Sequence, residues 1–224
     1  TQLNLVESGW IYTAIFGHFG ATLAASRLID PRADVLRNAQ GIVYCLASGN
    51  HQSTREGKAT KHVQPGFAAA NAITASLMAA RGLDGIKQPV AGEDGLARVY
   101  LHGKFEAARA LDRLGSYWQF DRLSIKPYPS CRLTHPAISA ALEMYKLLGE
   151  EDAKKIERVE LIIGPQAHDV VGRDAPERRS PVKPVNAQFS IYWCVAVALT
   201  YGEVTPIQLV SEIPPSPKIA EAIA

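Results

Sequence analysis

The spacing of apolar residues predicts that the first half of the chain is helical. Apolar positions recur three and four residues apart, which places them on one face of a helix. Alanine and glycine are frequent in these stretches, and small side chains allow neighbouring helices to pack closely. The segments predicted to be helical are residues 12–28, 33–48 and 67–81, together with a shorter helix at residues 105–114.

The pattern changes after Tyr117. Two short runs have the alternating or β-branched character of strands, and longer helical patterns follow each of them. A polar segment rich in Arg, Pro and Asp is typical of a mobile or surface-exposed loop. The expected elements are strands at 120–125 and 156–163, helices at 136–148 and 187–201, and the polar loop at 172–184.

This change of pattern predicts two domains. We expect an all-helical domain over residues 1–117 and an α/β domain over residues 118–224, so the fold is mainly α with a smaller α/β part. A hydrophobic content of 47% and a charged content of 21% are typical of globular domains with a proper core. The apolar stretch at residues 10–25 contains His18 and lacks a basic leader, which favours a buried helix over a membrane span.

Two basic segments carry the candidate chemistry. The first is the run from Lys126 to His135, in which two prolines restrict the backbone ahead of a predicted helix. The second places Lys61 and His62 shortly before the predicted helix 67–81. Free N–H groups at a helix N-terminus favour an anion, so both segments suit a carboxylate or a phosphate. The alternative is a pair of connectors whose cations are merely solvated.

Three phrases of the sequence resemble the MmgE/PrpD family, at residues 60–69, 126–135 and 187–192. The resemblance extends from about Gly9 to about Val204. This family includes 2-methylcitrate dehydratase, cis-aconitate decarboxylase and iminodisuccinate epimerase. The resemblance implies a helical domain that carries an α/β lid, with the active site in the cleft between them. Family members are longer than this chain, so it also implies a fragment, or a subunit that a partner chain completes.

The chemistry of this family assigns roles to individual residues by resemblance. Removing a weakly acidic C–H proton requires a nearby base and cations where enolate charge develops, and the substrate carboxylates require fixed clamps. Lys61 and Lys126 match lysines that line the family's site, and Tyr192 matches a tyrosine that faces it. The full expectation is catalytic Lys61, Lys126, His135 and Tyr192, with substrate binding by His62, Cys131 and Arg132.

Several of these roles have alternatives. His135 has an unperturbed pKa near neutrality, which suits an acid or a base, but a residue at a helix start also caps or packs. Tyr192 is either a site residue or a core phenol. Cys131 is a conceivable nucleophile, although no third orienting residue accompanies it and His135. No CxxC or HxxxH pair lies nearby to complete a metal site, and we expect neither a metal nor an organic cofactor.

Two positions depart from the decarboxylase-like members of the family. Ile11 and Cys131 stand where those members carry histidines, which counts against decarboxylation of cis-aconitate. The resemblance therefore implies a cofactor-independent lyase that abstracts a proton next to a carboxylate of a small di- or tricarboxylate, most like 2-methylcitrate dehydratase. The alternatives are an epimerase of an iminodisuccinate-like acid and a non-catalytic polycarboxylate-binding or partner subunit of a split enzyme.

Charge and cysteine content restrict the partners and the compartment. A net charge of +2, without a basic stripe, argues against a nucleic-acid partner. Three widely spaced cysteines favour a reducing compartment, and we expect a cytoplasmic protein. The predicted helices at 9–29 and 67–81 are so apolar that they require cover from other helices. We therefore expect a homo-oligomer or a complementing chain.

Overall fold

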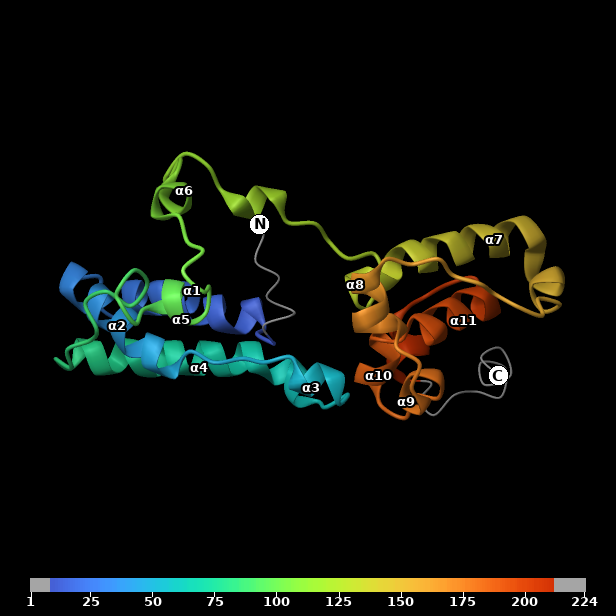
Figure 1. Ribbon diagram of the computed structural model, residues 1–224, viewed down its shortest axis with the longest axis horizontal. Helices are drawn as coiled ribbons and strands as arrows, with labels where there is room; N and C mark the ends of the chain where they lie inside the picture. Colours follow the sequence, from blue (N-terminus) through green and yellow to red (C-terminus); the bar gives the residue numbers. More distant parts are fainter. Residues whose placement is uncertain (1–8, 212–224) are drawn as a thin grey trace. The chain divides into compact units, whose positions relative to one another are not determined.

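The computed structural model describes residues 9–211, which belong to two units, Thr1–Arg122 and Leu123–Ala224 (Figure 1). We describe each unit by itself. Both consist of helices and connecting loops, and the described residues contain no β-strand beyond one isolated bridge between Trp10 and Asn50. The expectation of a mainly α fold is therefore confirmed.

The first unit is built on three long helices that pack against one another. They are α1 (Tyr12–Ile29), α2 (Ala33–Leu46) and α4 (Thr60–Ala80). Val35 and Val43 of α2 pack with Ala75 of α4 in a common core, as the periodicity of apolar residues predicts. Shorter helices complete the unit: α3 (Gln52–Arg55), α5 (Leu96–Val99), α6 (Ala107–Leu111) and the 3₁₀ turn η1 (Gln119–Arg122).

Helix α4 begins at Thr60, earlier than the predicted start at residue 67. Lys61 and His62 therefore lie in its first turn rather than in a loop before it. The buried side chain of Gln64 anchors this turn: its Nε2 donates to the Asn50 carbonyl at 3.0 Å, and its Oε1 accepts from the Asn50 N–H at 2.9 Å. These contacts hold the turn in place although Pro65 interrupts the helical hydrogen bonds.

The second unit packs α7 (His135–Ala153) against α11 (Ile191–Tyr201). Ile138 and Trp193 are fully buried in its core. The Ser190 hydroxyl caps α11 by accepting from the Trp193 N–H at 3.1 Å, and α11 ends at Gly202 in the left-handed conformation. The shorter elements are η2 (Arg132–Thr134), α8 (Pro165–Ala167), η3 (His168–Gly172), α9 (Pro176–Arg179), α10 (Pro184–Gln188) and η4 (Ile207–Ser211).

The two predicted strands are absent from the structure. Residues 120–125 comprise part of η1 and an irregular segment, and residues 156–163 form no ladder. Ile125 and Ile162 are 94% and 99% exposed, so neither run packs as a buried strand. A strand requires a neighbour to satisfy its backbone N–H and C=O groups, and nothing within residues 9–211 supplies one.

The polar loop at residues 172–184 also differs from its prediction. It contains the short helix α9, and Arg178 and Pro181 within it are buried. The interpretation of a mobile or surface-exposed loop is therefore wrong for Arg178. Its guanidinium folds inward because Nη1 donates a hydrogen bond to the Phe189 carbonyl.

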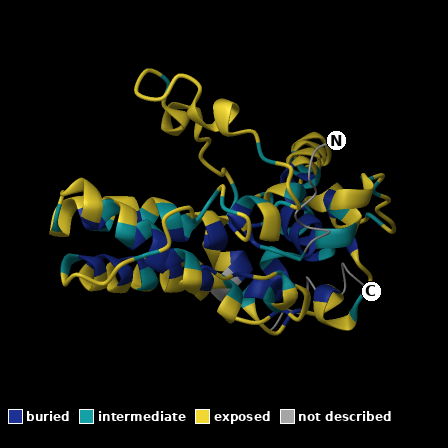
Figure 2. Cartoon of the chain, turned by 60° about the vertical axis from the view of Figure 1, so that its left-hand side comes forward, coloured by how far each residue is buried: buried dark blue, intermediate teal, exposed yellow. Residues whose placement is uncertain are grey.

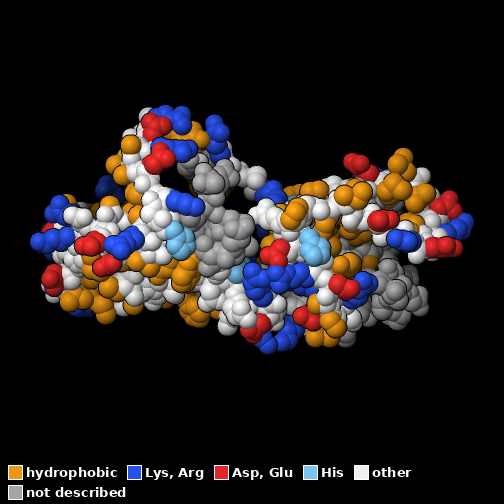
Figure 3. All heavy atoms as spheres, viewed as in Figure 1, with side chains coloured by type: hydrophobic (Ala, Val, Ile, Leu, Met, Phe, Trp, Pro, Cys, Tyr) orange, Lys and Arg blue, Asp and Glu red, His pale blue; other side chains and the backbone are white. Residues whose placement is uncertain are grey.

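Apart from Arg27 near the end of α1 and Lys61 in the first turn of α4, the two helices contain no Asp, Glu, Lys or Arg. No Asp, Glu, Lys or Arg occurs between Val63 and Ala80, yet half of the residues of α4 face outward (Figure 2). Figure 3 shows hydrophobic side chains at the surface of this unit. The large apolar side chains exposed on the two helices are Tyr12, Phe16, Leu23, Leu28, Ile29, Val63, Phe67, Ile73, Leu77 and Met78.

We propose that a second copy of the chain covers this apolar face, because two uncharged surfaces can meet without desolvating an ion. The purified chain should then elute as an oligomer, and Phe67→Glu should shift it toward monomer in light scattering. Leu147→Glu is the matched control, since Leu147 is 81% exposed on α7, outside this face. A monodisperse monomer of the unaltered chain would contradict the proposal.

Candidate functional site

The loop from Lys126 to His135 closes on itself at the start of α7. The Lys126 ammonium donates to the Ser130 carbonyl at 3.1 Å. The Thr134 hydroxyl donates to the Cys131 carbonyl at 2.8 Å and also lies 2.8 Å from the Ser130 hydroxyl. Together these contacts fix a compact turn that carries two cations, a thiol and a histidine.

His135 is buried at the base of this loop. Its side chain is 6% exposed, and the Tyr128 ring meets it edge-on with 5.2 Å between ring centroids. Its Nε2 is buried and has no hydrogen-bond partner in the described part of the chain. Such a nitrogen is rare in folded proteins and indicates strain or function.

The surroundings of His135 favour its neutral form. Burial lowers the pKa of His135; the carbonyls of Ser130 and Tyr128 oppose this shift, while the charges of Arg132 and Lys126 add to it. A neutral imidazole with an uncommitted nitrogen can accept a proton near pH 7.

This lowered pKa predicts how stability depends on pH. Because the unfolded chain binds a proton at His135 more readily than the folded chain, its contribution is complete above the unfolded value of about 6.5 and is lost as pH falls below it. The urea midpoint should therefore fall between pH 7 and 5, and less steeply in His135→Gln. Burial also lowers the pKa of His51, so His51→Gln is the matched variant in the first unit. An unchanged pH slope in His135→Gln would refute this prediction.

Arg132, within the loop, is exposed. Its Nη2 donates to the Ser124 hydroxyl at 3.1 Å and to the Ser124 carbonyl at 3.4 Å. Neither contact neutralises the guanidinium, so it retains its charge for a carboxylate. The structure thus brings Lys126, Cys131, Arg132 and His135 together on one segment.

Tyr192 lies on α11, in the same unit. Its hydroxyl donates to the Gly172 carbonyl at 2.8 Å, and the Arg179 guanidinium lies 4.9 Å from the centre of its ring. A backbone acceptor thus engages the hydroxyl proton, and both the catalytic role of Tyr192 and its core-phenol alternative stay predictions.

Lys61 and His62 belong to the other unit, in the first turn of α4. The pKa of His51 shows that positive charge gathers near this turn. Burial lowers that pKa most, and the charges of Arg55 and Lys61 lower it further. Thr54 contributes a buried hydroxyl without a partner in the described residues. The cleft between the two domains that the resemblance implies stays a prediction.

Arg178 is the residue that the sequence prediction missed. Its side chain is 7% exposed, burial lowers its pKa, and its carbonyl accepts from the Ser190 hydroxyl at 2.6 Å. No pattern in the sequence distinguishes it from the exposed Arg179 that follows. Cys194, by contrast, is chemically inert, because complete burial raises its pKa to about 12.

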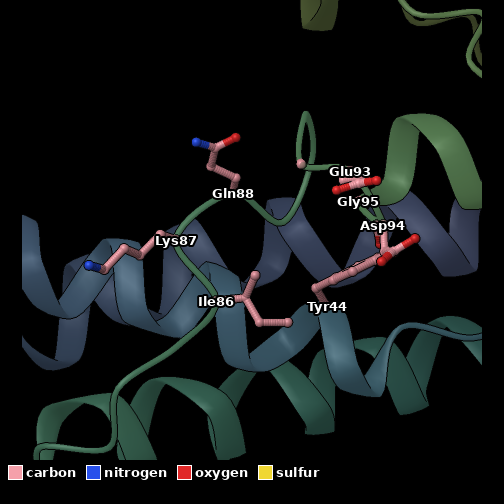
Figure 4. A pocket seen from close by; sticks show the side chains of 8 residues that line it. Tyr44, Ile86, Lys87, Gln88, Glu93, Asp94 and Gly95 are labelled. Carbon is pink, nitrogen blue, oxygen red and sulfur yellow. The ribbon is translucent and has the colours of Figure 1, made fainter.

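A pocket of about 370 Å³ lies elsewhere, on the first unit. Tyr44 forms one side and donates to the Asp94 carbonyl at 2.8 Å, while Lys87 and Gln88 point away from Tyr44 (Figure 4). None of the candidate residues lines this pocket, so it plays no part in the assignment.

Two further features are absent from residues 9–211. No helix there is long and apolar enough to cross a membrane. No group of three or more His, Cys, Asp or Glu side chains there could hold a metal ion. Independence from cofactors stays a prediction.

Comparisons with known proteins agree on one family. Residues 1–108 match the MmgE/PrpD N-terminal domain, and residues 128–224 match the MmgE/PrpD C-terminal domain. The cis-aconitate decarboxylase of Aspergillus terreus is 26% identical over 206 residues, 88% of this chain and 41% of the relative. The cis-aconitate decarboxylase-like protein oryM of Aspergillus oryzae is 26% identical over 210 residues, 90% of this chain and 43% of the relative. The chain therefore spans about two fifths of the length of these relatives.

Proposed function

Because this chain belongs to the MmgE/PrpD family, we propose that it acts in a cofactor-independent lyase whose substrate is a small di- or tricarboxylate. One observation carries the proposal. The loop from Lys126 to His135 combines two cations with a buried, neutral histidine whose Nε2 is uncommitted. Cations suit carboxylates and developing enolate charge, and a neutral imidazole suits proton transfer.

Individual roles follow from this geometry. Lys126 and Arg132 bind carboxylate oxygens and stabilise the charge that develops when the neighbouring C–H proton leaves. His135 carries that proton on Nε2. The family resemblance assigns Lys61 a catalytic role and His62 a role in substrate binding, and both assignments stay predictions.

Dehydration of an acid such as 2-methylcitrate is the proposed reaction within this class. Its support comes from two positions at which decarboxylase-like members of the family carry histidines. Ile11, buried at the N-terminus of α1, has no side-chain group that can transfer a proton, and Cys131 is a thiol. Decarboxylation is the second candidate, since the curated relatives are named cis-aconitate decarboxylases. Epimerisation of an iminodisuccinate-like acid and a non-catalytic binding subunit are the remaining alternatives.

The experiment is a substrate screen on the chain in its oligomeric form. 2-Methylcitrate, citrate, cis-aconitate and iminodisuccinate are each incubated with the protein, and products are followed by NMR. Conversion of one acid, unaffected by a chelator, supports the proposal, and the product distinguishes loss of water from loss of carbon dioxide. Conversion that a chelator abolishes and one divalent metal restores would contradict independence from cofactors.

A further inference from the structure

The second unit contains a buried cation, Arg178, which is 7% exposed and which no ion pair in the described residues includes. Its contact with the Phe189 carbonyl uses only a part of the five N–H donors of a guanidinium. A buried charge is costly unless an opposite charge or several hydrogen bonds compensate it.

Arg178 is held next to the candidate loop. The Phe189 carbonyl accepts from its guanidinium, and the preceding Gln188 carbonyl accepts from the Cys131 N–H at 2.8 Å. Two adjacent carbonyls at the junction of α10 and α11 thus fix Arg178 and Cys131 as neighbours. Burial lowers the pKa of Arg178, and the charge of the adjacent Glu177 opposes this shift without forming an ion pair in the described residues.

A second, independent observation concerns the same loop. His135, on the same loop as Cys131, has a buried Nε2 without a partner in the described residues. Lys126 reaches this loop from its other end, through the Ser130 carbonyl. The loop that carries Cys131 therefore combines a lysine with an unpaired buried nitrogen, and none of the ion pairs in the described residues includes Lys126 or Arg178.

We propose that Arg178 binds one carboxylate of the substrate over Cys131, while Lys126 binds another. This inference rests on the proposed function, since it names a second carboxylate contact in the same site. A guanidinium presents two parallel N–H donors to a carboxylate, which fixes the orientation of the acid. The site then prefers acids with at least two carboxylates over monocarboxylates.

Alkylation of Cys131 by iodoacetamide, read by mass spectrometry, tests the proposal directly. The probe is tricarballylate, a tricarboxylate without a hydroxyl group to eliminate. It should slow the labelling of Cys131 at least tenfold and leave Cys45 unaffected, because Cys45 is exposed on the first unit and serves as the internal control. Equal labelling of Cys131 with and without tricarballylate would overturn the proposal.

Two neighbouring arginines provide a matched pair of variants. Arg178→Gln should abolish the protection of Cys131, whereas Arg179→Gln should retain it, because Arg179 is exposed and pairs with Asp174 at 2.7 Å. Should Arg178→Gln fail to fold, Arg178→Lys keeps the charge but loses the paired donors, and it should need about tenfold more tricarballylate. Full protection in a folded Arg178 variant would refute the role of Arg178.

The outcomes separate this inference from the proposed function. If tricarballylate protects Cys131 in a manner that depends on Arg178, but the chain converts none of the acids, then the carboxylate contact is supported and the proposed lyase activity is contradicted. If turnover depends on Lys126 but not on Arg178, then the lyase activity is supported and the contact between Arg178 and a substrate carboxylate is contradicted.

Discussion

Replacing Lys126 by alanine should lower kcat/KM for the accepted acid by roughly 30- to 1000-fold, equivalent to about 2–4 kcal/mol of transition-state stabilisation. This is the scale of losing one oriented donor where negative charge develops. Lys126 is held for this role by its bond to the Ser130 carbonyl at 3.1 Å. Lys61→Ala should have an effect of similar size, since Lys61 lies in the first turn of α4.

Matched variants separate the lost charge from damage to the loop. Lys126→Gln keeps a donor for the Ser130 carbonyl without the charge and should be nearly as slow as the alanine variant. Lys146→Ala removes an exposed lysine from α7, and Lys58→Ala removes one before α4; both should retain turnover. Near-normal turnover in Lys126→Ala and Lys61→Ala would end the assignment.

The second large effect concerns the packing of α7 against α11. Gly202 has φ of 66°, and an added Cβ would lie 2.3 Å from the ring of Tyr145. Gly202→Ala should therefore cost roughly 1–2 kcal/mol for the left-handed backbone and roughly 1–3 kcal/mol more for overpacking, measured by urea unfolding.

Gly82→Ala is the control for the backbone cost alone. Gly82 follows the end of α4 and has φ of 92°, but an added Cβ meets no heavy atom within 4 Å. It should lose only the backbone contribution, roughly 1–2 kcal/mol. Equal losses in the two variants would show that the contact between Tyr145 and Gly202 does not limit stability.

Local signals predicted much of the helical structure. The predicted helix 187–201 ends correctly with α11 at Tyr201, although α11 begins only at Ile191, after the separate helix α10. The predicted end of the preceding long helix at residue 148 also corresponds to a real break, because Gly149 is non-helical within α7. These features depend on residues close in sequence, which is why periodicity and glycine positions reveal them.

Features that depend on distant partners were not predictable in the same way. Pro65 and Gly66 look like a helix start, but contacts between Gln64 and Asn50 extend α4 back to Thr60. The alternation at residues 156–163 is typical of a strand, yet a strand forms only where a neighbour satisfies its backbone.

In the candidate site, too, features set by neighbouring residues were predictable, and features set by distant contacts were not. The family phrase identified the loop from Lys126 to His135, since its residues are consecutive in sequence. The inward position of Arg178 depends on a carbonyl at Phe189, in a different helix junction. Likewise, only the structure shows that the Tyr192 hydroxyl donates a hydrogen bond to the Gly172 carbonyl.

Solvent deuterium incorporation tests the central claim most directly, because the account requires removal of a proton beside a carboxylate. The oligomeric form of the chain is incubated in D₂O with 2-methylcitrate, citrate, cis-aconitate or iminodisuccinate. Proton NMR then follows the C–H signals next to the carboxylates of these four acids. The account predicts that deuterium enters one of these acids or its product, and that Lys126→Ala slows this exchange at least tenfold. No incorporation into any of the four acids, or equal rates in the two proteins, would contradict it.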